Sequence, residues 1–347
     1  MNIKYLLPLC IAAMLMACSD DESSPTKAQD PAAVGSSSSV DALLPPGLSS
    51  SGTAPVDGNS SNSDAAQNGA ISNSGMAPVN GLSSSSPAPT GEVLDENGKL
   101  IALDPSKEYT FYGSELTGKE QFLYGRFEAR MKMASIPGTV SSMFLNYDNS
   151  YKKGDEPWNE IDIEVLGKSQ TQWQSNIITR EADPSIPGTT NSETIHDFGF
   201  DATQNFHLYT IVWTPEYVSW EIDSVEVRRD TLGMAHGTHA DADQVKFLTK
   251  PQSLRFNLWA SQTPAWTGKF TGIGLPIEQQ IDYVRAYTYD TTSKAFTLAW
   301  QDDFEGTSLN SDRWSRGNWT MELVEYRVQN VKVSDGMARI ILDYEAN

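Results

Sequence analysis

The chain has 347 residues, and its 45 Asp and Glu residues outnumber its 25 Lys and Arg residues, which gives a formal net charge of −20. Such a field repels nucleic acids and anionic polysaccharides, so the sequence argues against both, whereas a neutral polymer is unaffected by it. The two cysteines, Cys10 and Cys18, lie near the N-terminus, so we expect no disulfide and no thiol chemistry in the rest of the chain.

The N-terminus has the features of a secretion signal with a lipid attachment site. Residues 1–4 supply a short positive start, and residues 6–16 form an apolar stretch that is too short to span a bilayer. The residues before Cys18 resemble the lipobox of bacterial lipoproteins, in which the signal is cut before a cysteine that is then lipidated. The alternative is an ordinary secretory signal. We predict a signal peptide over 1–17 and a protein of the bacterial cell envelope. Its only membrane contact would be the lipid on Cys18, in the outer membrane, with the cell surface as one candidate side.

A segment of low complexity follows the signal. Ser, Pro, Gly, Ala and Asn dominate, and residues 36–39 and 83–86 are pure serine. This composition buries too little apolar surface to offset the chain entropy, so we predict a disordered tether over 18–104. A coil of residues 19–90 has an end-to-end distance of roughly 45–50 Å, enough to hold a folded domain away from a membrane.

The remaining residues, 105–347, predict one all-β domain. Apolar and polar residues alternate with the period of a strand, and no window carries a long apolar stripe of helical period. Many short strands separated by Gly, Pro, Asn and Asp turns are typical of a sandwich or barrel with few, short helices. The clearest alternating windows are 127–133, 217–227, 254–258, 281–289 and 328–342.

A further alternating window, 158–166, carries a run of acids. Its odd-numbered apolar residues would face a core, while Glu160, Asp162 and Glu164 share the opposite face. Neighbouring carboxylates repel one another, so stability alone would not select them. Trp158 opens the run, and acids beside a flat aromatic surface suit sugar chemistry. We therefore predict a glycosidase active site on this strand.

Spacing alone does not select the reacting pair. Glycoside hydrolysis uses two carboxyl groups, about 5–5.5 Å apart in retaining enzymes and about 6.5–9.5 Å apart in inverting ones. On a flat strand the α-carbons of Glu160 and Glu164 lie about 13 Å apart, so a retaining pair requires a concave strand. On the same flat strand the α-carbon of Asp162 lies about 6.6 Å from that of each glutamate. A solvated acidic strand and a calcium site are the alternatives.

Several segments together resemble glycoside hydrolase family 16. Residues 160–164, Glu-Ile-Asp-Ile-Glu, match the signature of the family, and 124–131, 206–213 and 255–259 resemble further family segments. The resemblance covers about 110–342 and is greatest to the circularly permuted lichenases, the 1,3-1,4-β-glucanase branch. It implies a β-jelly-roll sandwich of two antiparallel sheets with a concave substrate cleft.

The order of the segments indicates the permutation. Residues 296–304 and 309–314 look like the segment that opens a family domain, but here they stand near the C-terminal end. Permutation is tolerated because the termini of compact domains often lie close together. We therefore expect a circularly permuted domain over 105–347, and we expect it to be a monomer.

The resemblance implies roles for the three acids. Glu160 would be the nucleophile that forms a glycosyl-enzyme intermediate, and Glu164 would protonate the leaving oxygen and later deprotonate water. Asp162 would hydrogen-bond the nucleophile, so the titrations of the three groups would be coupled. No cofactor is implied for catalysis. The acids lack the extra residue of the laminarinase and κ-carrageenase branches, which favours the lichenase and xyloglucanase branches.

The resemblance also predicts the lining of the cleft. Sugar rings present apolar C–H faces, which flat aromatic side chains cover at little entropic cost. The aromatic positions are Phe144, Trp158, Trp259, Trp266 and Trp319. The polar positions, which would bind sugar hydroxyls, are Glu115, Gln174, Asn176, Arg255 and Asn257. Core packing is the alternative for any tryptophan, and we expect it for Trp213, Trp220 and Trp300.

Family members often bind one structural calcium ion through a carboxylate and backbone carbonyls, and calcium takes oxygen ligands of this type. Asp282 matches the carboxylate position, and Asp303 and Gly336 match other ligand positions. The alternative is that no ion is bound.

Three positions on the substrate side depart from the lichenase pattern. Asn146 replaces a tyrosine, Asp148 an asparagine and Asn318 an aspartate. We predict an endo-β-glucanase that hydrolyses mixed-linkage β-1,3-1,4-glucan with retention. The departures leave xyloglucan or another β-glucan as a second hypothesis, and a non-hydrolytic carbohydrate-binding jelly roll as a third.

Overall fold

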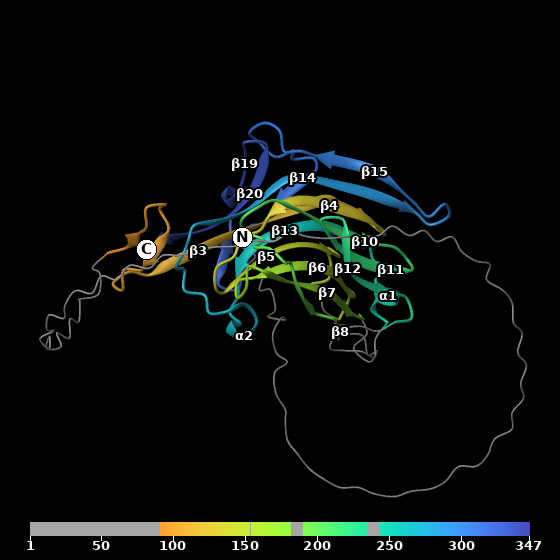
Figure 1. The fold of residues 1–347 in the computed structure, drawn as a ribbon, viewed down its shortest axis with the longest axis horizontal. Helices are drawn as coiled ribbons and strands as arrows, with labels where there is room; N and C mark the ends of the chain where they lie inside the picture. Colours follow the sequence, from red (N-terminus) through yellow and green to blue (C-terminus); the bar gives the residue numbers. More distant parts are fainter. Residues whose placement is uncertain (1–90, 153, 182–189, 235–242) are drawn as a thin grey trace, which may run out of the picture. The chain divides into compact units, whose positions relative to one another are not determined.

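The computed structural model of the protein (Figure 1) describes residues 91–152, 154–181, 190–234 and 243–347. The predicted signal peptide, Cys18 and the predicted tether up to residue 90 lie outside these ranges. Within them the structure is almost entirely β, as predicted. Its helical segments are α1 (Gln244–Phe247), α2 (Pro264–Thr267) and a 3₁₀ turn (Val328–Asn330). None of the helices in the described ranges is long and apolar enough to cross a bilayer.

One antiparallel sheet, called the site sheet below, contains the strand with the three acids. Side chains on successive residues of its strands point to opposite faces, so each strand offers one face to the core and one to the outside. In spatial order the strands are β16 (Trp314–Arg316), β3 (Tyr109–Phe122), β13 (Gln252–Ala260), β5 (Thr139–Asn146), β6 (Trp158–Leu166), β7 (Gln172–Arg180), and then β8 (Thr190–Asn191) and β9 (Thr194–Asp197), which both pair with β7.

The second antiparallel sheet, called the back sheet, covers the inner face of the first. Its strands in order are β12 (Val225–Thr231), β11 (Tyr217–Ile222), β10 (His207–Trp213), β4 (Gly125–Lys132) and β14 (Ile277–Asp290). The first part of β14 then pairs with β20 (Met337–Ala346) and the last part with β15 (Ala295–Asp302), while β19 (Val331–Ser334) pairs with β20. Figure 1 shows β4, β14 and β15 arching over β5, β6 and β7. The predicted β-jelly-roll sandwich of two antiparallel sheets is confirmed.

The two sheets are joined along β3, which pairs with β20 of the back sheet as well as with β13. β18 (Val324–Tyr326) pairs parallel with β3, and β17 (Thr320–Met321) pairs with β18. A small hairpin of β1 (Val93–Leu94) and β2 (Leu100–Ala102) precedes residue 105, the predicted start of the domain. The backbone N–H of Leu100 donates to the carbonyl of Leu275 (2.7 Å), so this hairpin is attached to the fold.

The hydrophobic core fills the space between the sheets. Ile161, Ile163 and Val165 of β6 are 0% exposed, which confirms the predicted core face of this strand. Burial of side chains of this size contributes about 1.5–3 kcal/mol each. Trp213 and Trp220 are also completely buried, and the predicted core packing of these tryptophans and of Trp300 is confirmed.

Two windows with strand periodicity are hairpins and not single strands. Residues 217–227 contain a turn between β11 and β12, where Asp223 and Ser224 have φ of 49° and 67°. Residues 328–342 contain the 3₁₀ turn and then β19 and β20, joined by a turn at Asp335 and Gly336 with φ of 56° and 70°. Two successive positive φ values define the tight hairpin turn whose twist matches that of the strands.

Candidate active site

The register of the site sheet gathers the predicted residues on the face opposite the core. In β6, Glu160 is paired with Asn146 of β5, and Asp162 lies between Phe144 of β5 and Asn176 of β7. Directly opposite residues project to the same face of a sheet. The side chains that surround the acids are therefore fixed by strand pairing and not by their distance along the chain.

The same face continues across the next strands. Glu164 is paired with Gln174 of β7, and its other neighbour, Ser142, is paired with Asn257 of β13. Asn257 in turn is paired with Glu115 of β3. Arg255 is paired with Phe144, which places its guanidinium on this face as well. The predicted acids and all five predicted polar positions share one surface.

Glu160 is partly buried and receives hydrogen bonds from Trp158 and Asn146, in addition to the one it shares with Asp162. The indole Nε1 of Trp158 and the amide Nδ2 of Asn146 (3.1 Å) both donate to its Oε2. Burial raises the pKa of Glu160 to about 7, although the bond from Trp158 and the positive charge of Arg255 favour the ionised form. Asn146, which replaces a tyrosine of the lichenase pattern, therefore supplies a hydrogen-bond donor to Glu160.

Glu164 is held by a chain of hydrogen bonds from the neighbouring strand. The Nε2 of Gln174 donates to its Oε2 (2.8 Å), and the indole Nε1 of Trp266 on α2 donates to the Oε1 of Gln174 (3.2 Å). Burial and the charge of Glu160 raise the pKa of Glu164 to about 8, although the hydrogen bond from Gln174 acts to lower it. The charge of Glu193 raises this pKa further, and sequence reasoning did not identify that residue.

Asp162, between the two glutamates, is 3% exposed. Burial raises the pKa of its carboxyl well above the usual range, and the charges of Glu160 and Glu164 and a hydrogen bond with Glu160 act in the same direction. Because neighbouring carboxyl groups resist ionising together, the three acids are only partly ionised at neutral pH. The group can thus present a carboxylate and a carboxylic acid at the same time.

Arg255 supplies positive charge beside the acids. Its Nη1 lies 3.0 Å from Glu115 Oε1 and its Nη2 lies 2.7 Å from Asp148 Oδ1. Asp148 also accepts from the hydroxyl of Ser253 (2.7 Å). The Nε of Arg255 is buried with no hydrogen-bond partner in the described part of the chain. Buried donors are normally paired, so this N–H is suited to a ligand oxygen.

The remaining polar positions are held by short contacts. The hydroxyl of Ser142 donates to Asn257 Oδ1 (2.6 Å), and the backbone N–H of Ser192 donates to Asn176 Oδ1 (2.9 Å). With their oxygens occupied in this way, both amides keep their NH₂ groups as donors. Such donors suit the hydroxyl oxygens of a sugar.

The predicted aromatic positions differ in how exposed they are. Phe144 and Trp259 are mostly buried, at 7% and 4% exposed, and Trp266 packs on Trp259 with ring centres 5.9 Å apart. Trp158 is partly buried at the start of β6. Trp319 is 37% exposed, lies before β17, and contacts Tyr326 in an edge-to-face arrangement. The structure therefore brings Trp158, Trp266 and Phe144 to the acids, whereas Trp319 stands on the segment beside β3.

Two of the three predicted calcium ligands are engaged in protein contacts. Asp282 on β14 lies 2.6 Å from Arg130 Nη1, and Asp303 accepts from Gln301 Nε2 (2.8 Å). Gly336 lies in the β19–β20 turn, where an added Cβ would stand 3.9 Å from Glu305 Oε1. No cluster of three or more His, Cys, Asp or Glu side chains suited to a metal occurs in the described ranges. A calcium site built mainly from backbone carbonyls stays a prediction.

Comparisons with known proteins show which family the chain is similar to. The model of the glycosyl hydrolases family 16 matches residues 87–285. A protein named beta-glucanase from Fibrobacter succinogenes is 42% identical over 238 residues, 67% of this chain and 64% of that protein. A beta-glucanase from Acetivibrio thermocellus is 33% identical over 200 residues, 56% of this chain and 53% of that protein. The chain thus spans 64% and 53% of the length of these two relatives.

Among solved structures, a Bacillus licheniformis beta-glucanase is similar in 58% of this chain and 83% of its own chain, with 24% identity and a TM-score of 0.40. A structure titled as a native glycosidic hydrolase is similar in 54% of this chain and 80% of its own, with 28% identity and a TM-score of 0.40.

Proposed function

The chain belongs to the glycosyl hydrolases of family 16, and from this premise we propose that it is an endo-β-glucanase that cleaves mixed-linkage β-1,3-1,4-glucan with retention. The observation that carries the proposal is the set of three acids on the outer face of β6, with the pKa of Glu160 near 7 and that of Glu164 near 8. A retaining glycosidase needs one ionised and one protonated carboxyl group, and this pair supplies both around neutral pH.

In the first step the ionised Glu160 attacks the anomeric carbon. The bond from that carbon to the leaving oxygen breaks, and the proton of Glu164 moves to that oxygen. Arg255 and the donors from Trp158 and Asn146 favour the ionised form of Glu160 before the attack. The product is an ester between Glu160 and the sugar.

In the second step Glu164 takes a proton from water, and the water oxygen displaces Glu160 from the anomeric carbon. Esterification removes the negative charge of Glu160, and that charge is one cause of the raised pKa of Glu164. Its loss lowers the pKa of Glu164 at the point where this group must act as a base. Asp162 hydrogen-bonds Glu160 and couples the two titrations.

The polymer is proposed from the strand geometry and from the relatives. β6 pairs with β5 and β7 without a register shift, which agrees with the absence of the extra residue of the laminarinase branch. Two relatives carry the name beta-glucanase. A neutral glucan also suits the net charge of −20.

We further propose the features that the described residues leave open. These are a signal peptide over 1–17, a lipid on Cys18 that holds the protein in the outer membrane of the bacterial envelope, a monomeric state, a circularly permuted domain and one structural calcium ion. Incorporation of labelled palmitate into the wild-type chain but not into Cys18→Ser tests the anchor. Calcium binding is tested by thermal unfolding with and without a chelator.

The polymer and the stereochemistry can be tested with the wild-type protein. Proton NMR of the first product should show the β-anomer, and an initial α-anomer would rule out retention. Reducing-sugar release should be highest on barley glucan among barley glucan, laminarin, carboxymethylcellulose and xyloglucan. Highest activity on xyloglucan would make xyloglucan the substrate in place of mixed-linkage glucan. Tight retention in affinity gels without hydrolysis would favour a binding module.

A further inference from the structure

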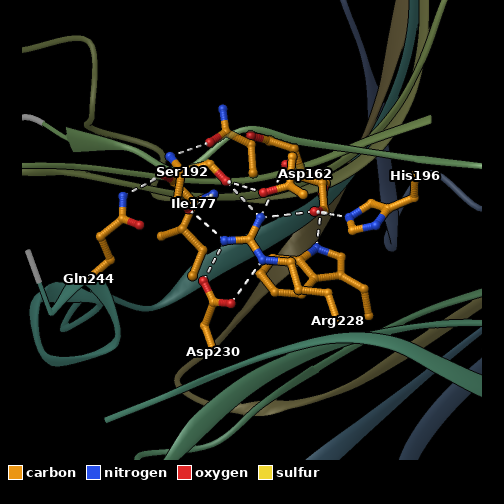
Figure 2. A network of polar contacts seen from close by, with 11 residues as sticks. Asp162, Ile177, Ser192, His196, Arg228, Asp230 and Gln244 are labelled. Atoms are coloured by element: carbon orange, nitrogen blue, oxygen red, sulfur yellow. Dashed lines mark hydrogen bonds and ion pairs between the residues drawn. The ribbon is translucent and has the colours of Figure 1, made fainter. Parts of the chain in front are cut away.

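A buried polar network lies behind the active-site strands, between the two sheets (Figure 2). At its centre is Arg228 on β12, which is 8% exposed and paired with Asp230 through Nε–Oδ1 (2.8 Å) and Nη2–Oδ2 contacts. Arg228 also donates to the hydroxyl of Ser175 on β7 (2.9 Å) and to the carbonyl of Ser192 (2.7 Å). His196 Nε2 lies 2.8 Å from the same hydroxyl of Ser175. The back sheet is thus bonded to the core side of the site sheet.

Trp220 extends this network to the acids. The guanidinium carbon of Arg228 lies 4.5 Å from the centre of the Trp220 ring. The indole Nε1 of Trp220, on β11, donates to the backbone carbonyl of Asp162 (2.9 Å). Asp162 lies midway between Glu160 and Glu164 on β6. The indole is therefore bonded to the strand at its central acid, from the side opposite the acid side chains.

Stability alone is a weak reason for such an arrangement. Burying two charges costs desolvation energy that their attraction only partly returns, and apolar replacements of buried ion pairs are often neutral or stabilising. A fully bonded network does fix the relative position of the groups that it joins. Catalytic groups must be held within about 0.5 Å of the productive geometry by the residues that support them.

We propose that Trp220, oriented by Arg228, is a positioning residue that fixes the backbone of β6 at Asp162 and thereby sets the separation of the Glu160 and Glu164 carboxyl groups. On a flat strand these two residues are too far apart to act as a retaining pair. A bond to the middle of the strand on its core side favours curvature that is concave toward the acids. The inference rests on the proposed function for its catalytic readout.

The test is Trp220→Phe, with Trp213→Phe as the matched control. Both tryptophans are 0% exposed and lie on neighbouring strands of the back sheet. The indole N–H of Trp213 has no hydrogen-bond partner in the described part of the chain, so its loss breaks no bond. Both changes remove the same atoms from the same core. Only Trp220→Phe removes the bond to the active-site strand.

We expect kcat on barley glucan to fall about tenfold or more in Trp220→Phe with little change in KM, because a misplaced reacting group raises the barrier more than it weakens substrate binding. Trp213→Phe should also lower the melting temperature, because it removes the same buried atoms, but it should keep the wild-type kcat. Equal kcat values in the two variants would overturn the proposal. If Trp220→Phe does not fold, Arg228→Lys replaces it, because lysine keeps the charge but not the planar group that lies over the indole.

A second measurement needs no activity and separates this inference from the proposed function. Carboxyl 13C NMR with labelled glutamate follows the titration of the Glu160 and Glu164 pair. Greater separation of the two carboxyl groups weakens their repulsion, so the higher of the two apparent pKa values should fall in Trp220→Phe and stay in Trp213→Phe. Inactivity of the wild type on every glucan would contradict the proposed function. An unchanged titration in Trp220→Phe would contradict the positioning role.

Discussion

On the core face of β6, Ile161, Ile163 and Val165 are completely buried. On the other face Glu160 and Glu164 are partly buried, and the charge of Glu160 raises the pKa of Glu164. One face of the strand is built from groups that stabilise the fold. The other face is built from carboxyl groups, and their ionisation makes the fold less stable. Substitutions on the two faces of the nine-residue strand β6 should therefore have different effects, on activity from the acid face and on stability from the core face.

The largest expected effect is on the acid face. Glu160→Gln and Glu164→Gln should each lower kcat/KM on β-glucan by about 10²–10⁴-fold, because each removes a group that takes part in bond cleavage in the proposed mechanism. Glu120→Gln, which changes an exposed carboxyl on β3 of the same sheet, should have no effect. Reducing-sugar assays measure all three. Normal hydrolysis by both active-site variants would show that the acids of β6 are not the catalytic groups.

The same acid face should limit stability at high pH. The folded-state pKa of Glu164 is about 8, above its value in an unfolded chain. The stability that this group contributes is therefore fully present below pH 4 and is lost as the pH rises to about 8. Relative to wild type, Glu164→Gln should thus gain melting temperature between pH 4 and pH 9, by roughly 2–4 °C for each kcal/mol. Calorimetry at the two pH values measures this, and an equal difference at both would contradict the prediction.

On the core face, the effect should be on stability alone. Ile163→Val removes one methylene from a completely buried site and should cost about 0.5–1.5 kcal/mol of unfolding free energy. The kcat should remain close to that of the wild type, because the backbone bonds of β6 are kept. Urea unfolding and initial rates measure the two quantities. A large loss of kcat at this small cost in stability would mean that the two faces cannot be separated.

The smallest expected effect comes from Asp148. The carboxylate of Asp148 forms an ion pair with Arg255 and partly neutralises its positive charge. That charge lowers the pKa of Glu160. In Asp148→Asn only Glu115 still pairs with Arg255, so more of the positive charge acts on Glu160. The acidic limb of the kcat/KM profile, expected near pH 7, should therefore move to lower pH by less than about 1 unit. Ser253→Ala removes another partner of Asp148 without changing charge and should leave the limb in place. A shift to higher pH in Asp148→Asn would reverse the assigned role of Arg255.

Much of β6 could be predicted from sequence because its information is local. The period of two assigns its buried and acidic faces without knowledge of any other strand. The turns at Asp223–Ser224 and Asp335–Gly336 were harder, since they interrupt an unbroken alternation and only one of their four residues is glycine. A continuous pattern of this kind cannot distinguish one long strand from a hairpin.

The rest of the site depends on pairing between distant segments. Glu115, Arg255 and Asn257 reach the acids only through the register of β3, β13 and β5, and that register could be anticipated by family resemblance but not by local pattern. Trp220 shows the limit most clearly. Its packing in the core was predicted, but its bond to the carbonyl of Asp162 depends on how the two sheets stack.

Trapping the intermediate tests the central claim most directly. A 2-deoxy-2-fluoro β-glucan disaccharide with a good leaving group should form a stable ester, and mass spectrometry of the digested protein should place the added mass on Glu160. Glu160→Gln should show no label. A label on another residue, or α-anomer as the first product without any label, would contradict the account.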